Sequence, residues 1–215
     1  MRGALVFFIA VLAGCSDSLD AQDYEHTRDY DRYSVNVDSG SVIVRSSNSR
    51  GSTRAVAQYE GDLPTVRVEV VGGVLEIEGV CGDRITDCWV DFFIDVQTAA
   101  PGSLNLADGT LKLQELAGDH SVELTDGSLT GEDLTMGLLI ADVSGGADVA
   151  WTGFPSQIDI ESTAGDIDIA VPTGDYALTL SASGAVTAEG VTDDPAADKS
   201  IRADAVDGSV SVSGG

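Results

Sequence analysis

Apolar and polar residues alternate along most of this chain with a period of two rather than the 3.6 of a helix. In the segment YSVNVDSGSVIV, Val35 and Val37 alternate with polar residues, a DSG turn follows, and Val42 and Val44 alternate again. Such alternation is typical of β-strands with one buried face. From residue 33 onward no stretch of ten or more residues carries a sustained helical period with capping signals, so we predict an all-β fold.

The alternation restarts after nine glycines. Each has an apolar residue two positions later and another apolar or small residue four positions later; they are Gly40, Gly73, Gly102, Gly109, Gly127, Gly145, Gly165, Gly184 and Gly208. From Gly109 the successive spacings are 18, 18, 20, 19 and 24 residues, and the segment VTDDPAADK lengthens the last one. The chain therefore repeats a unit of about 18 to 20 residues.

This repeat is too short for a propeller blade of about 40 residues or a helical repeat of about 33. At about 3.3 Å per residue it fits two short strands and two turns, which make one coil of a β-solenoid. We predict a single β-solenoid with coils of about 18–20 residues. Its core would stack Leu111 and Leu113 on Leu129, and Leu129 on Ala147 and Val149.

The amino terminus has the features of an exported lipoprotein. Arg2 precedes an apolar run, residues 4–13, that is about half of the ~20 residues needed to span a bilayer and matches the hydrophobic region of a signal peptide. The run ends in Leu-Ala-Gly-Cys at 12–15, which resembles the lipobox of bacterial lipoproteins. The resemblance implies cleavage before Cys15 and attachment of diacylglycerol to its thiol.

We expect three segments: a signal peptide at 1–14, the lipidated Cys15 with a polar tether at 15–32, and a β-solenoid domain at 33–215. The tether sequence is charged and has no apolar period. No second hydrophobic stretch is long enough to span a bilayer, so we expect the lipid to anchor the protein to a membrane. Ser16 after the cysteine is compatible with the outer membrane of a double-membraned bacterium.

The charge of the chain limits its partners. The sequence contains 36 Asp and Glu against 11 Lys and Arg, a formal net charge of -25. Such a field repels phosphate backbones, so nucleic acid is excluded as a partner. Cations, basic envelope proteins and neutral glycans remain, and the simplest role of the acids is to keep a β-rich protein soluble.

The other two cysteines, Cys81 and Cys88, have a spacing that can close a short disulfide loop in an oxidising compartment. Metal binding by this pair is disfavoured, because His26 and His120 lie far away in sequence.

Aromatic residues gather beside this pair, in CWVDFFIDV at 88–96. Alternation places Phe92, Ile94 and Val96 inward and leaves Trp89 and Phe93 as a possible ligand patch, such as a surface for sugar stacking.

Several segments resemble a known family. They are VNVDSGSVIV, VRVEVVGGVLEIEG, TAAPGSLNL, VPTGDYALTL and the recurrent DG-S/T-V/L pattern. They resemble bacterial envelope proteins of unknown function named putative adhesins, which are related to the head domains of autotransporter adhesins. The resemblance covers most of the chain after residue 33 and implies an exported, right-handed solenoid, a parallel β-helix or roll, without catalysis. The loop from Cys81 to Cys88 has no counterpart in the family pattern.

Enzymatic motifs such as GxSxG, HExxH, the P-loop and GxGxxG do not occur. His120, in GDHSVEL, is the one histidine of the predicted domain, and we expect it to be an exposed residue rather than a member of a catalytic triad.

Carboxylates are the remaining chemical candidates. Stacked coils would place Asp108 near Asp126, and Asp148 near Asp166 or Asp168, about 5 Å apart. Such a row either binds Ca2+ or is solvated. An Asp before Gly also has a local role, because its side chain bonds the backbone two residues on while Gly supplies a positive φ.

Together these features predict a lipid-anchored, non-catalytic binding, adhesion or structural module of the cell envelope that needs no cofactor. A carbohydrate-active solenoid enzyme with acidic catalytic residues and a Ca2+-dependent adhesion module are the alternatives. The final segment, GSVSVSGG, has no obvious cap, so its last edge is expected to pair with another protein or to be exposed.

Overall fold

A computed structural model describes residues 18–48, 51–60, 62–82 and 86–215. These residues form seventeen strands and no helix, so the prediction of an all-β chain is confirmed. The predicted signal peptide at 1–14 and Cys15 lie outside the described residues. Within the described part of the chain, no helix has the length and apolar character needed to cross a membrane.

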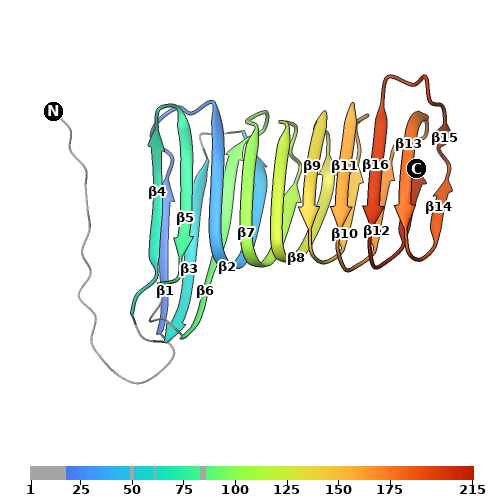
Figure 1. The fold of residues 1–215 in the computed structure, drawn as a ribbon. Coiled ribbons are helices and arrows are strands. Elements are labelled where there is room, and N and C mark those ends of the chain that lie inside the picture. Colours follow the sequence, from blue (N-terminus) through green and yellow to red (C-terminus); the bar gives the residue numbers. More distant parts are fainter. Residues whose placement is uncertain (1–17, 49–50, 61, 83–85) are drawn as a thin grey trace.

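The strands lie side by side in two ladders that form one elongated stack (Figure 1). The first ladder is parallel except where β4 meets β5. In spatial order it contains β4 (Thr65–Val71), β5 (Val74–Val80), the first parts of β2 (Arg32–Ser47), β7 (Gly102–Gln114) and β8 (His120–Leu134), then β9 (Leu138–Val143), β11 (Gln157–Ser162), β16 (Ser200–Ala205) and β13 (Asp175–Ala182).

The second ladder is antiparallel through its first three strands and parallel after them. It contains β1 (Ser18–Glu25), β3 (Ser52–Glu60), β6 (Thr86–Gln97), the second parts of β2, β7 and β8, then β10 (Ala147–Trp151), β12 (Ile167–Val171), β17 (Val210–Gly214) and β14 (Val186–Glu189). The short β15 (Thr192–Asp193) pairs with the start of β13. Each layer from that of β3 and β4 to that of β13 and β14 thus contributes one strand segment to each ladder, and β1 extends the second ladder by one more strand.

The core lies between the ladders and follows the alternation of the sequence. Leu111 and Leu113 are fully buried, and Leu111 is the register partner of Leu129, which in turn pairs with Ala147. Each of these steps is 18 residues, so the predicted stacking of Leu111, Leu129 and Ala147 is confirmed. Leu113 and Val149 instead share Gly131 as their register partner. Each buried leucine contributes about 1.5–3 kcal/mol through removal of its side chain from water.

The layers do not follow chain order at either end of the stack. β2 lies between the layer of β5 and β6 and the layer of β7. Likewise, β16 and β17 lie between the layer of β11 and β12 and the layer of β13 and β14. The expectation of an open edge at the final segment is therefore wrong. After β14 the connection at 191–199 leads the chain back by one layer, so that β17 lies between β12 and β14 and has a partner on both sides. The open edge belongs to β13 and β14.

The polar tether predicted at 15–32 is also corrected for its described residues. Residues 18–25 form β1, which pairs antiparallel with β3, and His26 and Tyr30 are buried. The Tyr30 hydroxyl accepts a hydrogen bond from the backbone N–H of Gln97. β1 has no apolar period, because backbone pairing with β3 holds it in place and its one leucine, Leu19, is 72% exposed.

Candidate functional site

A column of glycines forms the bend between the two ladders. A β-carbon on Gly109 would lie 1.8 Å from the carbonyl oxygen of Gly40, and one on Gly127 would lie 1.9 Å from the carbonyl oxygen of Gly109. The φ of Gly109 is also positive, at 134°. Glycine is required here because consecutive layers meet backbone to backbone. The repeated DG pairs therefore mark the bends within β7 and β8.

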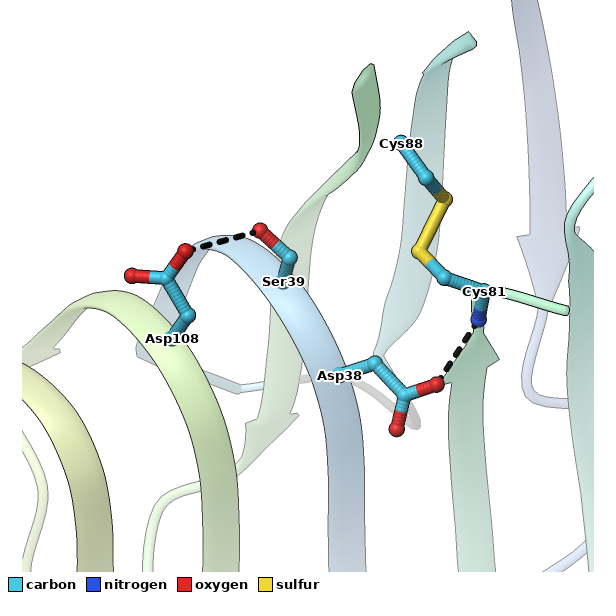
Figure 2. Close-up of a disulfide and its surroundings, with 5 residues drawn as sticks. All are labelled: Asp38, Ser39, Cys81, Cys88 and Asp108. Atoms are coloured by element: carbon cyan, nitrogen blue, oxygen red, sulfur yellow. Dashed lines mark hydrogen bonds between the residues drawn. A yellow bond between two sulfur atoms is a disulfide. The ribbon is translucent and has the colours of Figure 1, made fainter. Parts of the chain in front are cut away.

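Polar side chains at the bend bind the neighbouring layer (Figure 2). Asp38 accepts a hydrogen bond from the backbone N–H of Cys81 at 2.8 Å, and Asp108 accepts one from the Ser39 hydroxyl at 3.3 Å. The local role expected for Asp108, a bond to the backbone two residues on, is therefore replaced by a bond between layers. These contacts connect layers that are far apart in sequence.

The predicted disulfide is present between Cys81 and Cys88 (Figure 2). It lies where the layer of β5 and β6 is longer than its neighbour. Val35 and Val42 of β2 are seven positions apart. Their register partners in the longer layer, Ile77 and Phe92, are fifteen positions apart. The disulfide therefore closes the base of an eight-residue insertion at the bend.

Directly after the disulfide, β6 presents Trp89, Asp91 and Phe93 to the outside of the ladder; we call these three residues the aromatic strip. The exposed fractions are 36% for Trp89 and 47% for Phe93, whereas Val90 and Phe92 between them are fully buried. Because side chains alternate on a strand, the two exposed rings lie on one face, about 13 Å apart. The two residues of the predicted patch are thus exposed on one face of β6.

Asp91 orients the tryptophan of the strip. Its Oδ1 accepts hydrogen bonds from the indole Nε1–H of Trp89 and from the backbone N–H of Ser41, the latter at 2.9 Å. One carboxylate therefore fixes the indole ring to the neighbouring β2. A ring held in this way loses little conformational entropy when a ligand stacks on it.

Strands on both sides extend the surface of the strip. Gln58 and Arg54 of β3 are the register partners of Trp89 and Phe93, and Ile43 of β2 is the other partner of Phe93. The strip is thus bordered by an amide, a guanidinium and an apolar side chain.

A paired charge marks the end of the strip beyond Phe93. The Arg45 guanidinium donates to Asp95 at 2.5 Å, and the Ser52 hydroxyl donates to the same carboxylate at 3.1 Å. The bond from Arg45 is the main cause that lowers the pKa of Asp95 below its ordinary value. Asp95 is therefore ionised and paired, so that it adds no free charge beside Phe93.

The carboxylates considered as Ca2+ ligands lie in separate places. Asp108 and Asp126 are direct register partners at the bend, as predicted. Asp148 pairs with Asp168, one of its two predicted partners, on the outer face of the second ladder, whereas Asp166 lies at the bend.

The column of acids at the bend ends after Asp126. In the next layer Ser144 takes this place, and its hydroxyl accepts a hydrogen bond from the backbone N–H of Gly127. Asp166 accepts a bond from the backbone N–H of Ser209. Among the residues that the structure describes, no group of three His, Cys, Asp or Glu could hold a metal ion. Calcium binding stays a prediction.

A longer row of acids on the first ladder was missed in the sequence. Its members are successive register partners: Glu123, Asp142, Glu161 and Asp204. Arg202 pairs with Glu161 at 2.5 Å and with Asp159 at 2.8 Å. The sequence signal is one acid three or four positions before each of four glycines, at 127, 145, 165 and 208.

The expectation that His120 is exposed is wrong. Its side chain is buried; Nε2 lies 2.5 Å from the Tyr33 hydroxyl and Nδ1 lies 2.5 Å from the carbonyl oxygen of Gly118. The carbonyl can only accept, so Nδ1 carries the proton and Nε2 accepts from Tyr33. Burial lowers the pKa of His120 to about 4. Space for the pair exists because the register partner of His120 is Gly102, which has no side chain.

No family model matches the chain, and a search of curated proteins finds no match. Thirteen chains of solved structures match. One is a "putative cell adhesion protein" from Clostridium sporogenes, 14% identical, with 93% of this chain and 100% of that chain covered and a TM-score of 0.49.

Two further matches come from other bacteria. A "putative adhesin" from Bacteroides fragilis is 13% identical, with 93% of this chain and 98% of that chain covered and a TM-score of 0.33. A "putative lipid binding protein" from Parabacteroides distasonis is 16% identical, with 92% and 95% covered and a TM-score of 0.29. With TM-scores below 0.5, these likenesses carry no conclusion about this chain.

Proposed function

We propose that this protein is a lipid-anchored, non-catalytic binding module of the bacterial cell envelope, and that the aromatic strip binds neutral glycans. The lipid anchor and the strip are two separate parts of the proposal, because one rests on the amino-terminal sequence and the other on the geometry of β6. Each part has its own experiment.

The exposed rings of the strip are the observation that supports glycan binding. Trp89 and Phe93 lie on one face of a strand whose other face is core, and Asp91 holds the indole in place. Aromatic rings offer large, flat apolar faces with little entropy loss on binding, which suits the C–H faces of sugar rings. A neutral sugar is not repelled by a protein with a net charge of -25, whereas an acidic polysaccharide is.

Glycan binding is tested on an array of neutral and acidic oligosaccharides, followed by titration calorimetry of the best ligand. We expect Trp89→Ala and Phe93→Ala each to weaken binding at least about tenfold, which corresponds to about 1.4 kcal/mol. Phe154→Ala is the matched control, because Phe154 is 59% exposed and lies outside the strip. A parent protein that binds none of the neutral oligosaccharides, or strip variants that bind as tightly as the control, would contradict the proposal.

The layered architecture supports assignment of the fold to the β-solenoids. The supporting observations are the 18-residue steps that link β7, β8 and β10 and the glycine column at the bend. We propose the right-handed form. An experimental structure in which successive layers progress with the opposite hand would contradict this assignment.

The lipid anchor is tested by growth with an alkyne analogue of palmitate. We expect the full chain to be labelled and to fractionate with the outer membrane, and Cys15→Ser to be unlabelled. The double variant Cys81→Ser/Cys88→Ser should keep the label, since those thiols form the disulfide. A wild-type chain that is unlabelled and is found in the soluble fraction would contradict the proposed lipid anchor.

A further inference from the structure

The two ends of the stack differ (Figure 1). At the end that contains β4 and β1, antiparallel strands cover the parallel layers, and Arg67 pairs with Glu76 and Glu78 at 3.5 and 3.4 Å. At the opposite end, β13 pairs with β16 and β14 pairs with β17. Within the described part of the chain, only the first two residues of β13 have a further strand neighbour, β15. Both ends finish in edge strands. We call the first end capped, because β1 and β4 carry charged side chains along their length, and the second end open.

β13 directs part of its backbone away from the stack. The N–H of Ala177 donates to the carbonyl of Lys199, next to β16. Because alternate residues of a strand face opposite neighbours, Leu180 and Ala182 point their N–H and C=O groups outward. The N–H of Leu178, which also points outward, donates to the Asp193 side chain at 3.1 Å.

β14 has the same arrangement on the second ladder. The N–H of Val210 donates to the carbonyl of Ala185, so Ala185 faces β17. The next residue, Val186, and then Ala188 therefore direct their backbone groups outward. Together β13 and β14 present two short edges at one end of the molecule.

The apolar interior also reaches the surface at this end. Val186 is 47% exposed, whereas its register partner Val210 in the next layer is buried. Leu178 and Leu180 are only partly buried, although their partners Ile201 and Ala203 are fully buried. A terminal repeat normally covers its outer face with polar residues.

The middle of this edge is free of charge, between Asp175 at the start of β13 and Glu189 at the end of β14. Residues 176–188 contain no Asp, Glu, Lys or Arg in a chain that has 36 acids. Natural proteins usually protect exposed edges with charged residues or proline, which prevent strand addition. Here neither device is present over thirteen consecutive residues.

We propose that the edge of β13 and β14 is a homodimer interface, in which a second copy of this chain adds its own β13 and β14. Two copies with a charge of -25 each repel one another over most of their surfaces. The neutral edge is the place where they approach without opposed carboxylates. The edge is also self-complementary, because a two-fold axis brings the same outward N–H and C=O groups into antiparallel pairing.

The experiment is sedimentation velocity of the full chain with Cys15→Ser, in mild detergent, over a hundredfold range of concentration. We expect a monomer–dimer equilibrium whose dissociation constant falls when NaCl rises from 50 to 500 mM, because salt screens the repulsion. Val186→Lys should raise that constant at least about tenfold, since it places an unpaired charge in the interface. Val71→Lys is the matched control: Val71 is 44% exposed on β4, at the capped end, and its variant should dimerise like the parent.

A second measurement locates the contact. In hydrogen exchange, the amides of Leu180, Ala182, Val186 and Ala188 should become protected as the concentration rises, and Val186→Lys should abolish this effect. A parent that stays monomeric at every concentration would overturn the proposal. So would a dimer that salt weakens, one that Val186→Lys leaves intact, or one that forms without protection of these four amides.

Discussion

The buried His120 makes a sharp prediction about stability in acid. In the unfolded chain its pKa is about 6.5, and burial lowers it to about 4 in the folded protein. The fold holds the neutral imidazole, whose Nε2 accepts the hydrogen bond of Tyr33. The stabilisation from His120 is therefore fully present above pH 6.5 and is lost as the pH falls towards 4.

The magnitude follows from the two pKa values. Between pH 7 and pH 4.5 the unfolded chain takes up a proton that the folded protein binds only weakly, which removes about 2 kcal/mol from the free energy of unfolding. That is a substantial part of the 5–15 kcal/mol typical of a domain. Asp95 adds little over this range, because the pKa of an unfolded aspartate, about 3.9, already lies below pH 4.5 and Arg45 lowers the pKa of Asp95 further in the folded protein.

The assay is urea unfolding at a series of pH values between 7 and 4.5. The 36 acids give the protein its own pH dependence, so the informative quantity is the difference between wild type and His120→Gln, which cannot titrate at this position. We expect wild type to lose about 2 kcal/mol more than His120→Gln over this range. Tyr33→Phe, which keeps the histidine and its burial, should lose as much as wild type. Equal pH dependence in wild type and His120→Gln would refute the reasoning.

Two further predictions concern the bend. Gly109→Ala should lower the free energy of unfolding by about 3 kcal/mol or more, because its β-carbon would lie 1.8 Å from the Gly40 carbonyl oxygen and the backbone of a stacked layer cannot move aside. Gly72→Ala, where φ is 59° but no atom lies within 4 Å, should lower it by only about 1–2 kcal/mol in the same urea titration. The double variant Cys81→Ser/Cys88→Ser should lose about 2.5 kcal/mol through release of the eight-residue loop, measured as a lower Tm and urea midpoint; an unchanged Tm would show that the insertion is held by other contacts.

Features that depend on local alternation and regular spacing could be predicted from the sequence. The inward position of Phe92 and the outward position of Trp89 follow from the period of two, and the stacking of Leu111 on Leu129 follows from the 18-residue repeat. The disulfide followed from two cysteines close together in a chain expected to be exported. In each case the deciding interaction is with a nearby residue or with the same place in the next repeat.

Features that depend on distant pairing could not be predicted in this way. His120 is buried because Gly102 leaves room beside it and Tyr33, 87 positions earlier, provides the partner. β1 has no apolar signal, because its place in the fold is set by pairing with β3. The order of layers at both ends depends on which strand edge a later or earlier segment pairs with. That pairing joins distant residues, so a short-range sequence pattern does not predict it.

The displacement of the last strands into the stack has a consequence for the order of assembly. A stack built in order of synthesis could complete each layer as it emerges and could later fray from its carboxyl terminus. Here β13 and β14 are made before β16 and β17, yet they reach the remainder of the stack only through them. β16 and β17 must therefore be available before β13 and β14 can join the stack, and β17 cannot leave its place without separating β12 from β14.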